Sequence, residues 1–146
     1  MIVNFKYLNK KKIKLVMVDG GFDPLHDGHI RYFQEARKKY KKYKIVCCLA
    51  NDRYIKRKHK VLLNQERRSI VIDAIKYIDF VIKNNISTSY ALNKIKPSYY
   101  IKGKEWRNKL PLEEIKVCKK NKIKIVYLNT KKSSSSKILK NYEKKY

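Results

Sequence analysis

Residues 18–29 of the chain read Val18-Asp19-Gly20-Gly21-Phe22-Asp23-Pro24-Leu25-His26-Asp27-Gly28-His29. A short apolar run precedes the glycines, and a helical pattern follows them, with one face that carries Ile30, Phe33, Ala36 and Tyr40. A strand, a glycine-rich turn and a helix start bring unpaired amide N–H groups and the positive end of the helix dipole to one place. The sequence therefore predicts a phosphate-binding site at the start of this helix, with two imidazoles beside it.

A second interpretation of the two histidines is a surface turn or a pair of metal ligands. A structural zinc site takes about four ligands from histidine, cysteine or carboxylate side chains. The remaining histidine, His59, lies in a lysine cluster, and the cysteines are not in Cys-x-x-Cys spacing. We favour phosphate binding and predict no metal ion held by protein side chains.

Length and composition indicate one domain without a membrane span. A chain of 146 residues with 43% hydrophobic residues suffices for one core. Its apolar runs are only a few residues long, against roughly 18 for a membrane helix, and lysines from Lys6 onward interrupt any signal-peptide core. The three cysteines lack framework spacing, which predicts reduced thiols and a cytoplasmic location.

The formal net charge of +26 allows three interpretations. Lysines and arginines neutralise nucleic-acid phosphates, or they attract small polyanions such as nucleoside triphosphates into a cleft. A third account is compositional, because abundant lysine, isoleucine, asparagine and tyrosine are what an A/T-rich genome would encode. The lysines are spread over most of the expected elements, so nucleic acid is not the partner that we expect.

Short apolar runs alternate with helical patterns, which predicts an α/β fold: a Rossmann-like, doubly wound parallel sheet of five strands in a single domain. We expect strands at 14–18, 44–50, 80–82, 98–101 and 124–128. We expect helices at 28–40, 65–77, 88–95, 112–121 and 134–142. Residues 1–13 are interpreted as a lysine-rich leader, and residues 14–142 as the domain.

The second of these helices has the clearest pattern. Its apolar residues recur at helical spacing, and we expect them to form its buried face: Val71, Ala74, Ile75 and Ile78. In an open parallel sheet, ligands bind beyond the carboxyl ends of the strands. Polar clusters follow four of the expected strands, at 26–29, 51–60, 102–106 and 129–136. We therefore expect these clusters to meet at one edge of the sheet.

The string Gly20-Gly21-Phe22-Asp23-x-x-His26-x-Gly28-His29 resembles the signature of the nucleotidylyltransferase superfamily, and most closely its cytidylyltransferase-like branch. That branch includes glycerol-phosphate cytidylyltransferase and the nucleotidyltransferase domain of ADP-heptose synthase. The resemblance extends over roughly residues 14–140. It implies that the histidines donate hydrogen bonds to a reacting phosphate.

Residues 51–60 carry a run of cationic side chains, which we expect to form a mobile loop over a triphosphate; a solvated charge run is the alternative. The resemblance implies phosphate contacts for Lys58 and Lys60, with Lys56 as a competitor in the spacing. It also implies that Arg68, at the start of the next helix, binds nucleotide phosphates.

Two later segments complete the resemblance. Residues 102–106 are similar to the family's segment near the base and ribose, where an indole can stack and a carboxylate can accept hydrogen bonds; for Trp106, loop packing is the alternative. Residues 130–138 resemble a Ser-Thr-Thr motif that holds phosphates at a helix start. Asn129 stands where the glycerol-phosphate enzymes have an arginine that contacts the acceptor phosphate. Lys131 is the candidate to replace that arginine, but a lysine cannot make the two parallel hydrogen bonds of a guanidinium.

Taken together, the resemblance implies an enzyme, a nucleotidyltransferase. It would transfer CMP, or AMP as second choice, from CTP or ATP with Mg²⁺ to a phosphorylated small molecule resembling glycerol phosphate or a sugar phosphate, releasing pyrophosphate. Adenylyltransferases of the ADP-heptose or phosphopantetheine type are alternatives, and a non-catalytic basic nucleic-acid-binding protein is an alternative of another class. Resembling enzymes are often homodimers.

The implied catalytic residues are His26, His29, Lys58 and Lys60. The implied nucleotide-binding residues are Gly20, Gly21, Phe22, Asp23, Arg68, Gly103, Glu105, Trp106, Thr130, Ser134 and Ser135.

Overall fold

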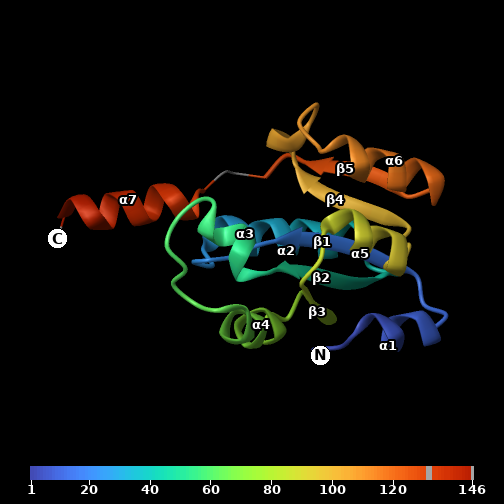
Figure 1. Cartoon of the computed structure of the whole chain (residues 1–146). Coiled ribbons are helices and arrows are strands. Elements are labelled where there is room, and N and C mark those ends of the chain that lie inside the picture. Colours follow the sequence, from blue (N-terminus) through green and yellow to red (C-terminus); the bar gives the residue numbers. More distant parts are fainter. Residues whose placement is uncertain (131–132, 146) are drawn as a thin grey trace.

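Five parallel strands form a single sheet in the order β3-β2-β1-β4-β5 (Figure 1). A computed structural model describes residues 1–130 and 133–145 of the chain. The strands are β1 (Leu15–Gly20), β2 (Lys44–Ala50), β3 (Phe80–Asn84), β4 (Tyr99–Gly103) and β5 (Lys124–Leu128). Every neighbouring pair is parallel. The predicted Rossmann-like, doubly wound sheet in a single α/β domain is confirmed.

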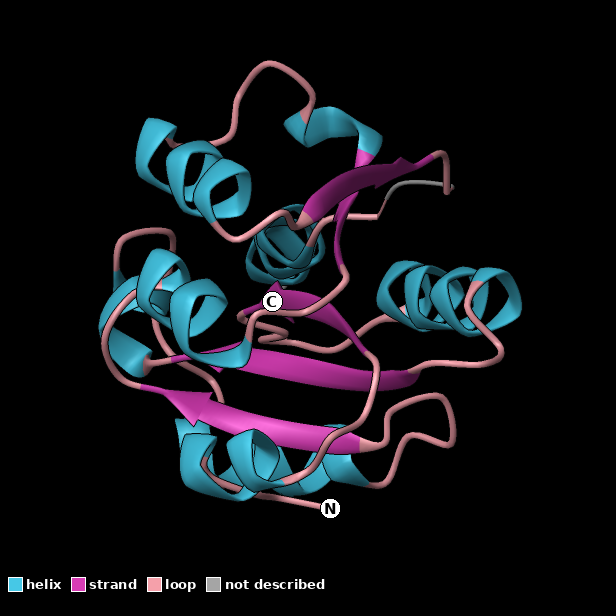
Figure 2. Cartoon of the chain, turned by 90° about the vertical axis from the view of Figure 1, so that its right-hand side faces the viewer, coloured by secondary structure: helices cyan, strands magenta, loops and turns pink. Residues whose placement is uncertain are grey.

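Helices cover both faces of the sheet (Figure 2). One face packs against α2 and α4, and the other packs against α1, α5 and α6. Helix α7 extends away from the sheet in Figure 1, and none of its described side chains is buried. The helices are α1 (Phe5–Lys10), α2 (Asp27–Lys39), α3 (Asp52–Lys56), α4 (Gln65–Asp73), α5 (Thr88–Ile95), α6 (Leu112–Lys120) and α7 (Ser135–Lys145), with a 3-10 turn, η1, at Lys104–Trp106.

Successive residues of the central strand point to opposite layers, as a period of two requires. In β1, Val16 and Val18 belong to the core beneath α2 and α4, whereas Leu15 and Met17 belong to the core on the other face. All four side chains are buried. A continuous apolar run is typical of a parallel strand that is covered on both faces, which is why the sequence predicts this strand well.

The first ten residues, predicted to be part of a lysine-rich leader, pack on the domain. The Val3 N–H donates to the Val81 carbonyl and the Val81 N–H donates to the Met1 carbonyl, both over 2.9 Å. The chain start therefore runs beside β3. In α1, Leu8 is 2% exposed within the core that it shares with α5. This segment is part of the packed structure.

Helix α4 is shorter than predicted and turns a different face inward. It ends at Asp73, and Val71 is 40% exposed whereas Ile72 is 1% exposed. The other inward positions of the helix hold Arg68 and Ser69. The predicted buried face is therefore wrong at Val71 and at Ala74, both of which are exposed. A pattern of apolar residues cannot reveal an arginine that points into the protein.

A short helix lies where a continuous cationic loop was predicted. The Asn51 side chain accepts a hydrogen bond from the Tyr54 N–H over 2.9 Å and so caps α3, whose Ile55 is buried. The Lys58 N–H then donates to the Ile55 carbonyl over 2.8 Å. The loop prediction is wrong at 52–56, because the asparagine cap and one apolar anchor suffice to form a turn of helix.

The three cysteines, Cys47, Cys48 and Cys118, are free and buried. Burial raises the pKa of each thiol, and that of Cys118 to about 11, so they remain protonated at neutral pH. Within the described part of the chain, no helix is long and apolar enough to cross a bilayer.

The inward face of α4 can be tested with two matched substitutions. Ile72→Ala should lower the free energy of unfolding by about 2–5 kcal/mol, because it leaves a cavity in the core. Ile70→Ala removes the same atoms from a side chain that is 59% exposed and should change it by about 0.5 kcal/mol or less. Urea unfolding of both variants makes the comparison, and equal losses would contradict the inward face described here.

Candidate active site

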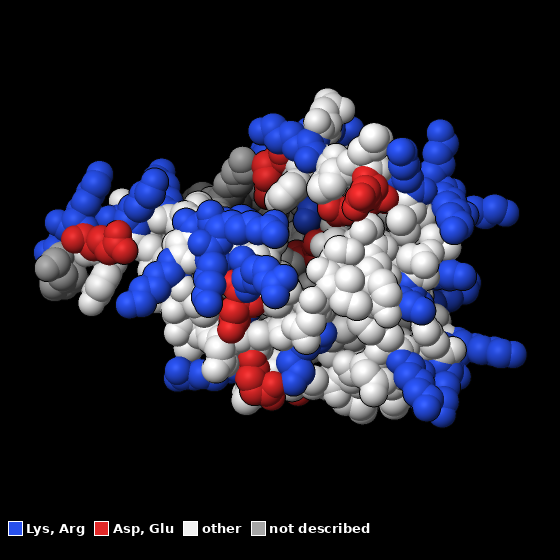
Figure 3. Space-filling model, in the orientation of Figure 1, with Lys and Arg blue, Asp and Glu red and all other residues white. Residues whose placement is uncertain are grey.

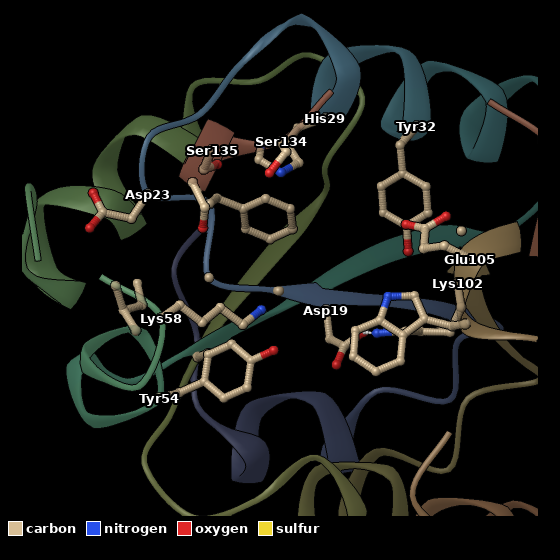
Figure 4. A pocket seen from close by; sticks show the side chains of 18 of the residues that line it. Asp19, Asp23, His29, Tyr32, Tyr54, Lys58, Lys102, Glu105, Ser134 and Ser135 are labelled. Atoms are coloured by element: carbon tan, nitrogen blue, oxygen red, sulfur yellow. Dashed lines mark hydrogen bonds and ion pairs between the residues drawn. The ribbon is translucent and has the colours of Figure 1, made fainter. Parts of the chain in front are cut away.

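A cavity of about 650 Å³ opens at the carboxyl ends of the strands. Figure 4 shows Tyr54 and Lys58 on one side of it, Lys102 and Glu105 on the opposite side, and His29 between them. The sequence-predicted residues that line it are Gly20, Gly21, Phe22, Asp23, His26, His29, Lys58, Gly103, Glu105, Trp106, Ser134 and Ser135. Three predicted residues lie outside this lining: Lys60, Arg68 and Thr130.

The two histidines cap α2 together. The His26 N–H donates to Nδ1 of His29 over 3.3 Å, and the His29 N–H donates to Nδ1 of His26 over 3.4 Å. The rings are stacked, with centroids 3.6 Å apart and planes inclined by 19°. This reciprocal cap satisfies two of the N–H groups that a helix start leaves free. It also fixes both imidazoles relative to the helix.

Each ring has a defined hydrogen-bonding role. Because Nδ1 accepts a hydrogen bond, a neutral ring carries its proton on Nε2. Burial and then the neighbouring His26 lower the pKa of His29 to about 3, and burial lowers the pKa of His26 as well. Both rings are therefore neutral Nε2–H donors at pH 7. Among the described residues, Nε2 of His26 is buried without a hydrogen-bond partner, and a ligand oxygen could supply one.

Two glycines leave room for this geometry. A Cβ on Gly28 would lie 3.0 Å from the His26 ring and 3.0 Å from Cβ of Ser133. A Cβ on Gly20 would lie 2.8 Å from the Phe22 ring. That ring packs edge-on against His29, with centroids 4.9 Å apart. Phe22 therefore supports the histidine from within the protein.

Asp23 holds the segment between α3 and α4 in place. Its carboxylate accepts hydrogen bonds from the N–H groups of Leu62 over 2.8 Å and Leu63 over 3.0 Å. The residue is 3% exposed, and Figure 4 shows its carboxylate turned away from the cavity. Asp23 therefore positions the segment that carries Lys58.

Of the competing lysines, the structure brings only Lys58 to the cavity wall. Its ammonium lies 4.6 Å from the centroid of the Tyr54 ring, and both side chains project inward in Figure 4. Lys56 and Lys60 are exposed and are not among the described lining residues.

Arg68 is wholly buried behind the cavity. Its guanidinium donates to the Leu63 carbonyl over 2.8 Å, to the Gly21 carbonyl over 2.7 Å and to the Ala50 carbonyl over 2.9 Å. It also forms a 2.6 Å ion pair with Asp52. Instead of facing the cavity, as predicted for a phosphate ligand, Arg68 ties together the chain after β1, the end of β2 and the start of α3.

The serines at the start of α7 close the cavity beside the histidines. Ser135 Oγ donates to the Pro24 carbonyl over 2.8 Å, and Ser134 Oγ accepts from the Lys137 N–H over 3.3 Å. These contacts fix the start of α7 against the loop that precedes α2. Lys131, the predicted substitute for an arginine, lies outside the described residues.

At the opposite end, Gly103, Glu105 and Trp106 line the cavity from the end of β4 and from η1. Glu105 is exposed and Trp106 is half-buried. The Lys102 ammonium lies 4.4 Å from the centroid of the indole ring, which is within cation–π range. The indole is thus held at the cavity wall by the strand end beneath it.

Sequence reasoning missed the ion pair at this end. The Lys102 ammonium lies 2.8 Å from the Asp19 carboxylate, and both side chains are nearly buried. Thr88 donates a 3.3 Å hydrogen bond to the same carboxylate. Asp19 ends the apolar run of β1, and β1 pairs with β4. A charged residue at the end of each of two apolar strands was the signal available in the sequence.

Mg²⁺ has no side-chain cage in the described part of the chain. No group of three or more histidine, cysteine, aspartate or glutamate side chains could hold a metal ion there. Asp19 is already paired with Lys102, and Asp23 binds backbone N–H groups. The residues present therefore do not fit a resident metal ion.

The chain matches the family model described as cytidylyltransferase-like over residues 17–141. It is 30% identical over 124 residues to the FAD synthase of Aciduliprofundum boonei, covering 83% of this chain and 80% of that protein. It is 34% identical over 92 residues to the FAD synthase of Ferroglobus placidus, covering 62% of this chain and 59% of that protein. It is 32% identical over 99 residues to the bifunctional protein HldE of Aliarcobacter butzleri, covering 66% of this chain and 21% of that protein.

Solved structures support the fold. The lipopolysaccharide core biosynthesis protein of Thermoplasma volcanium superposes with a TM-score of 0.65 at 24% identity, covering 82% of this chain and 99% of that one. Pantothenate synthetase of Thermus thermophilus superposes with a TM-score of 0.59 at 12% identity, covering 92% and 65%. The chain belongs to the cytidylyltransferase-like family and is a nucleotidyltransferase-like enzyme.

The structural role of Arg68 predicts a large effect on stability. Arg68→Met should lower the free energy of unfolding by about 3–5 kcal/mol, because it leaves Asp52 and three carbonyls without their donor. Arg67→Met, at the exposed neighbouring position, is the matched control and should change it by about 0.5 kcal/mol or less. Urea unfolding measures both. A stable Arg68→Met protein with weakened nucleotide binding would instead place the guanidinium in the nucleotide site.

The depressed pKa of His29 predicts a loss of stability in acid. Its pKa is about 3 in the folded protein and 6.5 when unperturbed, so the unfolded chain binds more protons between these values and stability falls as the pH drops below 6.5. The stability advantage of the wild type over His29→Asn should shrink by about 1–2 kcal/mol between pH 7.5 and pH 5. Urea unfolding at both pH values measures it, and a constant difference would exclude a buried neutral imidazole.

Proposed function

We propose that the protein transfers an adenylyl group from ATP to the phosphate of a small phosphate monoester and releases pyrophosphate. The observation that carries the proposal is the pair of stacked, neutral imidazoles that cap α2 at the cavity. Fixed, uncharged N–H donors at a helix start suit a phosphate group on which negative charge develops. The cavity volume, about 650 Å³, is in the usual range for a small-molecule site.

The reaction needs no covalent enzyme intermediate. An oxygen of the acceptor phosphate attacks the α-phosphorus in line, and the bond from that phosphorus to the oxygen bridging to the β-phosphate breaks. The electron pair leaves with pyrophosphate. The Nε2–H groups of His26 and His29 donate to the α-phosphate oxygens, and Lys58 neutralises charge on the departing group. Catalysis then consists of positioning and of charge stabilisation by groups that are already in place.

The far end of the cavity suits the nucleoside. Trp106 offers an indole face for a base, while Glu105 offers a carboxylate for amine or hydroxyl donors. The start of α7, with Ser134 and Ser135, lies beside the histidines and suits the β- and γ-phosphates. Mg²⁺ arrives with the triphosphate as part of the substrate.

ATP is our choice of nucleotide because of the relatives. An FAD synthase makes a dinucleotide with an adenylyl half, and two such proteins are among those similar to this chain. The sequence around Trp106 resembles the cytidylyltransferases and by itself favours CTP, so CMP transfer is the runner-up.

A phosphate monoester such as FMN, a sugar phosphate or glycerol phosphate is the proposed acceptor, although position 129 lacks the arginine of the glycerol-phosphate enzymes. A cytoplasmic location and a homodimer stay predictions.

The reaction can be tested with a matrix of substrates. Wild-type protein with Mg²⁺ is mixed with ATP, CTP, GTP or UTP and with FMN, sn-glycerol 3-phosphate or a heptose 1-phosphate, and pyrophosphate release is measured. We expect release from ATP with one acceptor. Release from CTP alone would establish cytidylyl transfer instead. No release from any pair, with no thermal stabilisation by any triphosphate, would contradict nucleotidyl transfer and favour the non-catalytic alternative.

Variants then separate the residues. His29→Asn and Lys58→Met should each lower kcat by roughly 10²–10³-fold, the usual effect of removing one group that stabilises the transition state. Lys60→Met is the matched control for Lys58→Met, and it should retain kcat within about threefold because Lys60 is not in the described cavity wall. Thermal denaturation verifies that each variant folds. Equal losses at both lysines would contradict the placement of Lys58.

A further inference from the structure

The edge of the sheet opposite the cavity carries many lysines. Because the strands are parallel, the loops that precede them share this edge. The basic edge is defined here as the exposed lysines of these loops, the adjoining helix ends and the strand starts. They are Lys10, Lys11, Lys12, Lys14, Lys38, Lys39, Lys41, Lys42, Lys44, Lys76, Lys94, Lys96, Lys119, Lys120, Lys122 and Lys124.

Backbone hydrogen bonds place part of the basic edge in one row. The Lys44 N–H donates to the Lys14 carbonyl over 3.0 Å, and the Lys124 N–H donates to the Ser98 carbonyl over 3.2 Å. Ser98 in turn donates to the carbonyl of Leu15 over 2.8 Å. Lys44 and Lys124 therefore begin β2 and β5, and Lys14 directly precedes β1, in a sheet where β4 separates β1 from β5 and strands are about 4.8 Å apart. Lysines that are dispersed in the sequence thus share one edge of the sheet.

Acidic residues are few at the basic edge, and those described there have partners. Asp79 is occupied by Arg37, by Lys44 and by the Ile45 N–H, and Asp73, at the end of α4, forms an ion pair with the N-terminal ammonium. Lys44 is also the one lysine of the basic edge with an ion pair in the described structure. In Figure 3, lysines and arginines project from the right-hand margin, where the strands of Figure 1 begin, and no acidic atoms are visible at that margin.

Composition and helix dipoles do not account for this segregation. An A/T-rich coding bias would raise the number of lysines everywhere, without removing acids from one edge. The helix dipole favours lysine in the last turn, but Lys11 and Lys12 lie beyond the end of α1, and Lys41 and Lys42 lie beyond the end of α2. Concentrating like charge destabilises the folded state by self-repulsion. A polyanion bound to the edge would relieve it.

We propose that the basic edge binds the phosphate backbone of nucleic acid without sequence preference. Exposed ammonium groups gathered along one edge of the sheet match a chain with a regular series of phosphates. Lysine contacts phosphates but lacks the bidentate fork with which arginine reads guanine. The arginine nearby, Arg37, is committed to the Tyr43 and Tyr77 carbonyls and to Asp79.

A lipid surface fits this edge less well. Among the described residues, the large apolar side chains exposed near the edge are Ile13 and, beside β3, Met1 and Ile2, so there is little to insert into a bilayer. The cavity lies at the other edge of the sheet. Nucleic acid on the basic edge would therefore leave the nucleotide site open, and the proposal is independent of the proposed reaction.

Binding is tested by fluorescence anisotropy with the whole protein. The probes are two labelled 20-base-pair DNA duplexes of unrelated sequence and a labelled 20-nucleotide RNA, at 50 to 200 mM salt. We expect the duplexes to bind within about threefold of each other. If about five phosphates are neutralised, affinity should fall by roughly 500-fold across this salt range. No binding at 50 mM salt, or affinities that differ widely between the duplexes, would overturn the proposal.

Two quadruple variants locate the surface. The edge variant replaces Lys11, Lys12, Lys41 and Lys42 with glutamine. The control variant makes the same change in charge away from the edge, at Lys109, Lys116, Lys140 and Lys144. The edge variant should bind the duplexes at least tenfold more weakly and with a smaller salt dependence, whereas the control should stay within about threefold of wild type.

Three further outcomes decide the proposal. Equal losses in both variants would show a response to net charge and would overturn it. Stronger, edge-dependent binding to phosphatidylserine vesicles than to nucleic acid would assign the surface to a membrane and would also overturn it. Unchanged thermal denaturation and pyrophosphate release in the edge variant would confirm that its loss of binding is local to the basic edge.

Discussion

The five strands all run in one direction, and this parallel pairing sends every carboxyl end to one edge of the sheet and every amino end to the other. Loops at the first edge build the cavity, and loops at the second carry the basic edge. The chain has 12 acidic residues, and the cavity lining includes Asp19, Asp23, Glu105 and Glu114. The same lining includes Lys58, Lys102 and Lys137, so side chains of both signs meet in the site, whereas lysines dominate the basic edge.

Within the cavity, backbone contacts do most of the positioning. The imidazoles are held by two N–H groups of α2, and the guanidinium of Arg68 joins three carbonyls from separate segments. Asp23 fixes the segment between α3 and α4 by accepting hydrogen bonds from two further N–H groups. Contacts of this kind place donors before a ligand arrives, so little reorganisation is needed during a reaction.

The strands and the histidine pair could be predicted because their signals are local. Apolar runs mark strands that are buried on both faces, and the glycine and histidine spacing marks the turn into α2. Arg68 could not be placed, because its partners come from three distant segments and a polar residue is expected outside. For the same reason the ion pair between Asp19 and Lys102 could not be predicted, because it depends on β1 and β4 being adjacent in the sheet. The gathering of lysines likewise follows from topology, and no window of sequence shows it.

Trp106 has a consequence for how the protein can be observed. It is the one tryptophan in the chain, it lines the cavity, and a cation stands 4.4 Å from the centroid of its ring. Indole emission responds to nearby charge and to stacking partners. The intrinsic tryptophan fluorescence of the unlabelled protein therefore originates at the cavity wall, so a change in indole emission reports the occupancy of that site without any added dye.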